Sequence, residues 1–330
     1  MTSEERREQR YQRRKAARLK KRQEAIGKYD DFERVASLNS LYEAAREASK
    51  GVDWKASVQR YNSLLLFNIS KTRAELLAGK DIRRGFICFD ICERGKLRHI
   101  KSVHFSERVV QKSFCTNIIY PTFTRSLIYD NGASQQGKGT QFATNRLTAH
   151  LRRHFRKYGR EGGILLIDFS DYFGNVAHEP LFKIYRQIFT DPRVIALGMS
   201  FISAFGDKGL GLGSETSQIN AVMLPNCADH YAKEVLRIRG YGRYMDDTYL
   251  LHHSIAYLEE CLEKLRAIYS EYGIVINEKK TKIVDLKHGF TFLKTHFYIT
   301  ETGRIIKKPC RDSITRERRK LKKQADLVAS

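Results

Sequence analysis

The sequence has little of several features that mark other classes of protein. Its six cysteines form no Cys-x-x-Cys pair and have no matching histidine cluster, so neither a disulfide framework nor a zinc site is indicated. No apolar run approaches the roughly 18 residues of a membrane helix, and the N-terminus is too charged for a secretory signal. We therefore expect a soluble cytoplasmic protein with no membrane partner.

Acidic residues are also scarce beside basic ones. The 330 residues include 37 Asp and Glu against 60 Lys and Arg, which gives a formal net charge of +23. Such a surplus favours a polyanionic partner, because binding releases the counterions condensed on a nucleic acid. Charge alone fits a basic ribosome-associated protein as well as a nucleic-acid enzyme. The 42% of hydrophobic residues can furnish a sizeable core.

The first half of the chain is expected to be mainly helical. Residues 4–24 contain ten basic residues and almost no apolar ones, which predicts a solvated helix or arm, either contacting nucleic acid or remaining a charged tail. Apolar spacing predicts two helices between Leu38 and Leu77. A β-hairpin then follows over FICFDIC and KLRHIKSVHF, with its turn at residues 93–95. Helical spacing returns in two later segments, 107–122 and 140–158.

The second half alternates strands and helices. An apolar strand ending at Asp168 is followed by a predicted helix over residues 217–236, by a hairpin around Asp246 and Asp247, and by an amphipathic helix from Ile255. Further short strands come after this helix. The order strand, helix, hairpin, helix, strand is that of a split βαβ, ferredoxin-like sheet, which is the architecture of a polymerase palm.

Three carboxylates are predicted to meet at one edge of that sheet. Asp168 ends a strand, while Asp246 and Asp247 form the tip of the hairpin. Adjacent Asp residues at a turn are often just solvated, but both flanks here are apolar and β-forming, so the like charges would repel unless a cation is present. Two-metal phosphoryl transfer needs such ligands around ions about 3.5–4 Å apart. We expect two Mg²⁺ ions, with Mn²⁺ as a possible substitute.

The same residues carry a family resemblance. Residues 244–247 are the YMDD box of reverse transcriptases, and residues 167–173 (IDFSDYF) resemble their first metal-binding motif. The resemblance covers about residues 38–325 and implies an α+β right-hand polymerase with fingers and a ferredoxin-like palm. It implies that Asp168 and Asp247 bridge the two metal ions. An RNA template, a DNA or RNA primer and deoxynucleoside triphosphates are the implied partners.

Further positions match the family's functional residues. Lys96 and Arg98 lie where members grip the incoming triphosphate, although loose surface charge is the alternative. Phe173 matches the bulky residue that excludes a ribose 2′-OH, unless it is a packed core residue. Lys280, in NEKKT, matches a lysine that acts as a general acid for pyrophosphate.

Three more segments resemble the family less specifically. RVVQ (residues 108–111) and GKGT (residues 137–140) resemble finger segments of bacterial reverse transcriptases, and their glycines permit close approach of a template strand. FTFLKTHF resembles the primer-grip strand pair, although Lys294 stands where the family usually has glycine.

The segment from Leu212 to Gln218 indicates a subclass. It matches the LGxxxSQ pattern of reverse transcriptases from diversity-generating retroelements, which are error-prone at template adenines and work with a basic accessory protein. The resemblance makes Leu212, Gly213 and Gln218 nucleotide-binding residues. A leucine cannot hydrogen-bond a sugar or base, so reduced discrimination is physically reasonable. Retron and phage-defence reverse transcriptases are alternatives, as is a catalytically idle RNA-binding protein on the same scaffold.

The expected subdivision follows from these segments. We expect a basic N-terminal helical arm, then fingers, then a palm carrying a finger-side insertion at 190–212, and finally a truncated thumb. The corresponding ranges are 1–60, 61–160, 161–300 and 301–330. Because a thumb clamps the duplex behind the active site, a short one predicts weak processivity or dependence on a partner.

Overall fold

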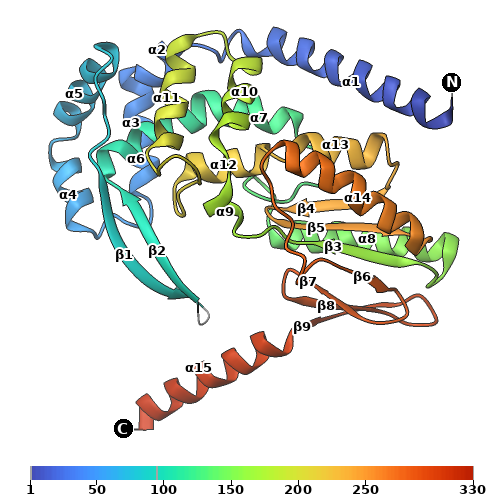
Figure 1. Cartoon of the computed structure of the whole chain (residues 1–330). Coiled ribbons are helices and arrows are strands. Elements are labelled where there is room, and N and C mark those ends of the chain that lie inside the picture. The colour runs from blue at the N-terminus through green and yellow to red at the C-terminus, as the bar shows by residue number, and fades with distance from the viewer. Residues whose placement is uncertain (1, 94–95, 330) are drawn as a thin grey trace. The chain divides into compact units, whose positions relative to one another are not determined.

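The computed structural model describes residues 2–93 and 96–329 (Figure 1). The chain divides into two compact units. The first unit extends to residue 127 and also contains residues 171–227 and 272–274. The second contains residues 128–170, 228–271 and the chain from residue 275. Within the described residues, no helix is long and apolar enough to cross a membrane.

The first unit is built mainly of helices. The N-terminal helix α1 (Ser3–Ile26) begins with a capping box between Thr2 and Glu5 and is mostly exposed, as its charge predicts. Tyr11 is nevertheless buried and donates a hydrogen bond to the carbonyl oxygen of Cys227. The following helices are α2 (Phe32–Ala36), α3 (Leu38–Ser49), α4 (Ala56–Ser63), α5 (Leu65–Leu77) and α6 (Phe105–Phe114).

The later helices of this unit belong to two further segments. After α6 come a π-helical turn η1 (Cys115–Ile119), α7 (Tyr120–Phe123) and a 3₁₀ turn η2 (Thr124–Ser126). The segment after residue 170 adds α9 (Tyr172–Asn175), α10 (His178–Ile188), α11 (Pro192–Ser203) and α12 (Glu215–Met223). Buried aromatic side chains join these helices, and Phe123 packs edge to face against Tyr185 with 5.7 Å between ring centroids.

A long two-stranded hairpin completes the first unit. Strand β1 (Phe86–Glu93) pairs with β2 (Lys96–Val103) in one continuous antiparallel register, which confirms the hairpin predicted from their β-forming residues. The predicted turn includes residues 94 and 95, which lie outside the described part of the chain. Large apolar side chains remain exposed on these strands, among them Phe89 and Leu97.

The second unit is organised around a four-stranded antiparallel sheet of order β4-β5-β3-β6. Its strands are β3 (Gly163–Ile167), β4 (Gly240–Tyr244), β5 (Asp247–His252) and β6 (Lys282–Asp285). A small sheet of β7 (Phe290–Phe292), β8 (Thr295–Ile299) and β9 (Ile305–Pro309) follows. The helices are α8 (Thr140–Tyr158), α13 (Asn226–Glu234), α14 (Ile255–Glu271) and α15 (Arg311–Ala329).

Alternating residues of the central strands bury both faces of this sheet. Ile164 and Leu166 of β3 join Leu147 and Leu151 of α8 in one apolar cluster, which also contains Phe297 of the small sheet. The other face is packed by α14, whose residues at helical spacing are buried. Because side chains alternate along a strand, this two-sided burial fixes the strand register.

Two helix predictions were wrong in detail. The segment predicted as one helix over residues 217–236 is two helices, α12 and α13, separated at Pro225, because proline lacks the amide hydrogen that a helix interior needs. The region between Leu38 and Leu77 contains three helices instead of two, because the chain turns again at Leu64. The predicted helix over residues 140–158 agrees with α8 at both ends.

Candidate active site

The two acidic segments meet at one edge of the second unit's sheet. Strands β3 and β5 pair antiparallel, and the last pair in the register is Ile167 with Thr248. Asp168 therefore directly follows β3 at the place where Asp247 begins β5. Burial, and then the negative charges of Asp246 and Asp168, raise the pKa of Asp247 to about 7. The three predicted acids thus lie close enough to repel one another.

The NEKKT segment is attached to the same strand end. The backbone amide of Asn277 donates to the carbonyl oxygen of Asp168 at 2.8 Å, and its side-chain amide donates to Asp168 Oδ1 at 3.2 Å. The Lys280 ammonium lies 2.8 and 2.9 Å from the two carboxylate oxygens of Asp168. This hydrogen bond raises the pKa of Lys280, so the lysine stays protonated beside the acids.

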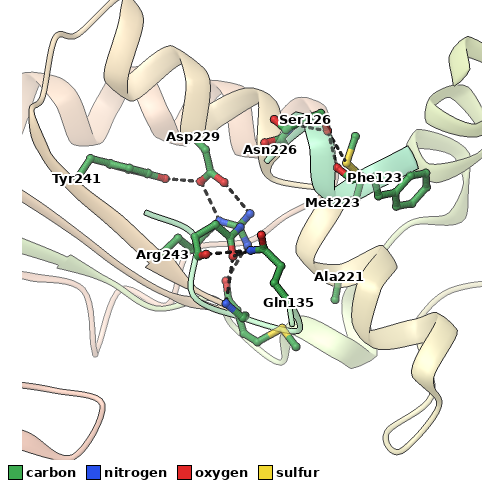
Figure 2. Close-up of polar contacts among 12 residues, drawn as sticks. Phe123, Ser126, Gln135, Ala221, Met223, Asn226, Asp229, Tyr241 and Arg243 are labelled. Carbon is green, nitrogen blue, oxygen red and sulfur yellow. Dashed lines mark hydrogen bonds and ion pairs between the residues drawn. The ribbon is translucent and has the colours of Figure 1, made fainter. Parts of the chain in front are cut away.

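The hairpin tip is held by a buried ion pair that the sequence analysis missed. Met245, at the turn, has a positive φ of 54°, a conformation that is unfavourable for a residue other than glycine. The Arg243 guanidinium donates to the Met245 carbonyl oxygen at 3.1 Å and to both oxygens of Asp229, at 2.8 and 2.7 Å. Tyr241 donates to Asp229 Oδ1 at 2.6 Å, so three side chains converge on one buried network (Figure 2).

The Asp229–Arg243 pair is completely buried, with 0% of either side chain exposed. The sequence did contain a signal for this pair, because Arg243 stands in an otherwise apolar, β-forming hairpin where an unpaired charge would be unfavourable. Its partner lies on α13, outside the hairpin, so the pairing could be identified only from the tertiary structure. A fork of guanidinium donors against a carboxylate fixes orientation as well as distance, which suits a group that positions a turn.

The residues at the sheet edge fit a divalent cation. Within the described part of the chain, no three His, Cys, Asp or Glu side chains are already arranged around a metal position. Burial and then two neighbouring carboxylates raise the pKa of Asp247, and Lys280 lowers it, so a bound cation would be favourable at this edge. Carboxylate oxygens are hard ligands suited to Mg²⁺ or Mn²⁺.

Two predicted nucleotide-binding residues line one pocket of the first unit. Phe173 and Leu212 face a cavity of about 290 Å³. The Gly-rich segment is attached beside Phe173, because the amide of Leu210 donates to the Phe173 carbonyl oxygen at 2.7 Å. Gly209 has a positive φ of 91°, and a side chain there would press against the backbone of Phe173 and Gly174.

The hairpin residues at this pocket differ from the predicted ones. His99 and Lys101 of β2 line the pocket, whereas Arg98 does not. Successive side chains of a strand point to opposite faces, so Arg98 belongs to the other face of β2. The side chain of Lys96 lies outside the described part of the structure. Lys101 is therefore the cation that sequence reasoning missed, and strand alternation was the signal that could have found it.

The LGxxxSQ segment is joined to the RVVQ segment within the first unit. The Ser214 hydroxyl caps α12 by accepting from the Ser217 amide and donates to Gln111 Oε1 at 3.1 Å. Gly213 has a positive φ of 91°, which explains a glycine there, and Gln218 is exposed. Two motifs about a hundred residues apart thus form one local structure.

Two glycine-related motifs of the second unit have structural explanations. Lys138 donates to the carbonyl oxygens of Tyr129 and Asn131 at 2.9 and 3.0 Å, so it fastens its own loop. In the primer-grip-like hairpin, Leu293 and Lys294 both have positive φ, 47° and 61°. A two-residue turn of this kind usually takes glycine at its second position, so Lys294 occupies the expected turn position at a conformational cost.

The antiparallel sheet with a helix on each face and acids at its hairpin tip defines the palm of a right-hand polymerase. The reverse transcriptase (RNA-dependent DNA polymerase) family matches residues 93–297, more than half of the sequence, and the chain belongs to this family. The predicted α+β polymerase fold is thereby confirmed. Membership of this family is consistent with the predicted enzyme class, a nucleotidyltransferase of the RNA-directed DNA polymerase type.

Solved telomerases have a similar fold. The telomerase of Candida albicans, determined with the TWJ fragment of telomeric RNA, has a TM-score of 0.50 and 11% identity, covering 68% of this chain and 46% of that one. Apo telomerase from Candida tropicalis has a TM-score of 0.47 and 13% identity, covering 76% and 53%. The chain thus spans about half the length of these proteins. No curated protein matches it.

The buried Asp229–Arg243 pair makes a measurable prediction. Asp229→Asn should lower the free energy of unfolding by about 3–5 kcal/mol, because it leaves a buried guanidinium without its counter-charge. The measurement is denaturant unfolding of the variant beside Glu301→Gln, which removes the exposed partner of Arg160. The control should change stability far less.

A double variant isolates the interaction itself. Asp229→Leu with Arg243→Met should cost less than the sum of the two single changes, because neither charge is then left unpaired. Strictly additive effects would show that the two side chains are not energetically coupled.

Proposed function

We propose that this chain is an RNA-directed DNA polymerase that adds deoxynucleotides to a DNA or RNA primer by two-metal phosphoryl transfer with Mg²⁺. The observation that carries the proposal is the meeting of Asp168, Asp246 and Asp247 at one sheet edge, with Lys280 bound to Asp168. Family membership supports the same activity. An RNA partner in general is further supported by the TWJ fragment of telomeric RNA in the structure of the similar Candida albicans telomerase.

The roles of the acids follow from their positions. Asp168 and Asp247 would hold the two ions from neighbouring strands, and Asp246 would be a weaker or structural ligand. The bound ions would activate the primer hydroxyl and neutralise charge on the phosphates. Lys280 holds a proton on Nζ at the same edge and is suited to give it to the departing pyrophosphate.

The pocket of the first unit supplies nucleotide-contacting groups. Phe173 would place its ring against the position of a ribose 2′-OH and so favour deoxynucleotides. Lys101 and His99 would contact the triphosphate from β2, in the role that the sequence predicted for Lys96 and Arg98. Leu212, Gly213 and Gln218 would shape the nucleotide site.

Polymerase activity is tested by primer extension on a defined RNA template with Mg²⁺. Asp247→Ala and Asp168→Ala should lower the extension rate by about 100-fold or more, because each removes a metal ligand. Asp285→Ala is the matched control, since Asp285 pairs with Gly163 at the opposite end of β3. Chelation of the metal should abolish extension and Mg²⁺ should restore it.

A catalytically idle RNA-binding protein is the competing hypothesis. It would bind the template but give no extension in the unmodified chain under any divalent metal. That result, with the protein shown to be folded, would contradict the proposed activity.

Phe173 should control the choice of sugar. Phe173→Ala should raise incorporation of ribonucleotides relative to deoxynucleotides by about 10- to 100-fold, because the steric barrier to the 2′-OH is lost. The measurement is single-nucleotide extension with each nucleotide type. Phe182→Ala, a change to a half-buried ring on α10, should leave the ratio unchanged. An unchanged ratio in both variants would make Phe173 a packing residue.

We further propose that the enzyme belongs to a diversity-generating retroelement and works with a basic accessory protein. The LGxxxSQ segment from Leu212 to Gln218 supports this subclass, and Leu212 lines the pocket that contains Phe173. A leucine there offers no hydrogen bond that would penalise a mispaired nucleotide. Retron and phage-defence enzymes are the alternatives for the same fold.

The subclass predicts the pattern of errors. Complementary DNA copied from a defined RNA should carry its substitutions mainly opposite template adenines. Leu212→Gln should reduce that error frequency by about fivefold, which corresponds to about 1 kcal/mol from one restored hydrogen bond. Sequencing the products measures both. Errors spread evenly over the four template bases would contradict the subclass while leaving the polymerase activity intact.

A further inference from the structure

A second cationic cavity lies in the second unit, away from the acidic sheet edge. It has a volume of about 300 Å³ and is formed by the C-terminal half of α8, the start of β4 and the end of β5. Its rim carries four exposed cations, Arg153 and Lys157 from α8 and Arg237 and Arg239 from the segment entering β4. None of the motifs that identify the polymerase lies here.

The four cations are not neutralised by the protein. No Asp or Glu is among the described residues that line the cavity. Within the described chain, none of the four side chains forms an ion pair with a carboxylate. Four like charges around one opening repel one another, so the arrangement costs free energy unless an anion is bound. The site therefore has the electrostatics of a phosphate-binding surface.

Aromatic rings accompany these charges. His253 stacks on Tyr158 with ring centroids 4.4 Å apart and an interplanar angle of 11°. His253 is exposed, so the stack extends to the mouth of the cavity. Two further lining histidines, His150 and His154, are buried, and burial lowers the pKa of both, so they line the cavity in the neutral state. Cations beside a stacked ring surface are the combination that holds single-stranded nucleic acid.

The cavity is separated from the proposed catalytic edge by the length of the β4–β5 hairpin. Gly240 pairs with Leu251 at the cavity end, whereas Tyr244 pairs with Asp247 at the acidic end. The four residue steps from Gly240 to Tyr244 span about 14 Å along the strand. A strand bound at the cavity is therefore not the primer end that is being extended.

We propose that this cavity is a second nucleic-acid site, which binds a single-stranded RNA segment by its phosphates and stacks one base on His253. Arg153, Lys157, Arg237 and Arg239 contact the phosphates. A strand suits the site better than a small enclosed ligand, because the cations are spread around an exposed rim while the cavity itself is at the lower limit of small-molecule pockets. The site can anchor RNA while the primer terminus is elsewhere.

The test measures binding of a short, fluorescently labelled single-stranded RNA by anisotropy. The protein is first saturated with an unlabelled primer–template duplex, without nucleotides, so that the proposed active site is occupied. Arg153→Gln with Lys157→Gln should weaken binding about tenfold at moderate salt. It should also reduce the slope of log affinity against log salt by about 1.4, because two phosphate contacts are lost.

The same helix provides the matched control. Arg152 and Arg156 are exposed, have the same four-residue spacing and lie one position away, but they do not line the cavity. Arg152→Gln with Arg156→Gln removes the same net charge and should change affinity by no more than about twofold. Equal losses in the two double variants would overturn the proposal, because general charge would then explain the binding.

Two further measurements separate the parts of the proposal. His253→Ala should weaken binding about fivefold with an unchanged salt slope, because stacking is lost and no phosphate contact is. Inorganic phosphate and a nucleoside monophosphate serve as competitors, and displacement of the RNA by either at an equal phosphate concentration would make this a small-anion site instead. The unmodified chain should bind the RNA at this site whether or not it extends a primer, so failure of the polymerase proposal stays distinguishable from failure of this one.

Discussion

The pairing register of β3 and β5 is the constraint on which the proposed site depends. Because Ile167 pairs with Thr248, Asp168 and Asp247 come to the same edge of the sheet. A slip of one residue would turn every side chain to the opposite face and separate the acids. The register is protected by burial on both faces, since Leu166 packs in the α8 cluster while α14 covers the other side. Packing thus determines where negative charge gathers.

The negative charges of the three acids repel one another, which is unfavourable in free energy. Surrounding residues stabilise this arrangement in two ways, by supplying positive charge and by holding the turn in place. The Lys280 ammonium lies against the Asp168 carboxylate, so its positive charge partly balances the negative charge of the acids. It also provides a proton donor at this edge of the sheet. The turn itself is held from inside, because Arg243 reaches the Met245 carbonyl while it pairs with Asp229. A buried ion pair contributes little net stability but can fix geometry, which is the property that a strained turn requires.

Some of the surplus basic residues of the chain gather at two separate pockets. In the first unit, Lys101 lies in a pocket with Phe173 and Leu212, where a triphosphate would need compensation. In the second unit, Arg153 and Arg239 surround a cavity at the end of the β4–β5 hairpin that is remote from the acids. One hairpin therefore has negative charge at its tip and positive charge at its base, which would separate the proposed site of chemistry from the proposed RNA-binding site.

Local patterns in the sequence determined the elements and the proposed acids. Runs of β-forming residues predicted the β1–β2 hairpin and the acid-bearing turn, and helical spacing predicted α8, because these depend on neighbours in the chain. Prediction failed where the answer depended on distant contacts. Asp229 gave no sign of being the partner of Arg243, and nothing in GKLRHI showed that Lys101 would face the pocket that contains Phe173. The cavity beside His253 likewise exists only after α8, β4 and β5 have packed. Periodicity is a property of the chain, whereas the pairing of buried charges and the lining of a cavity are properties of the fold.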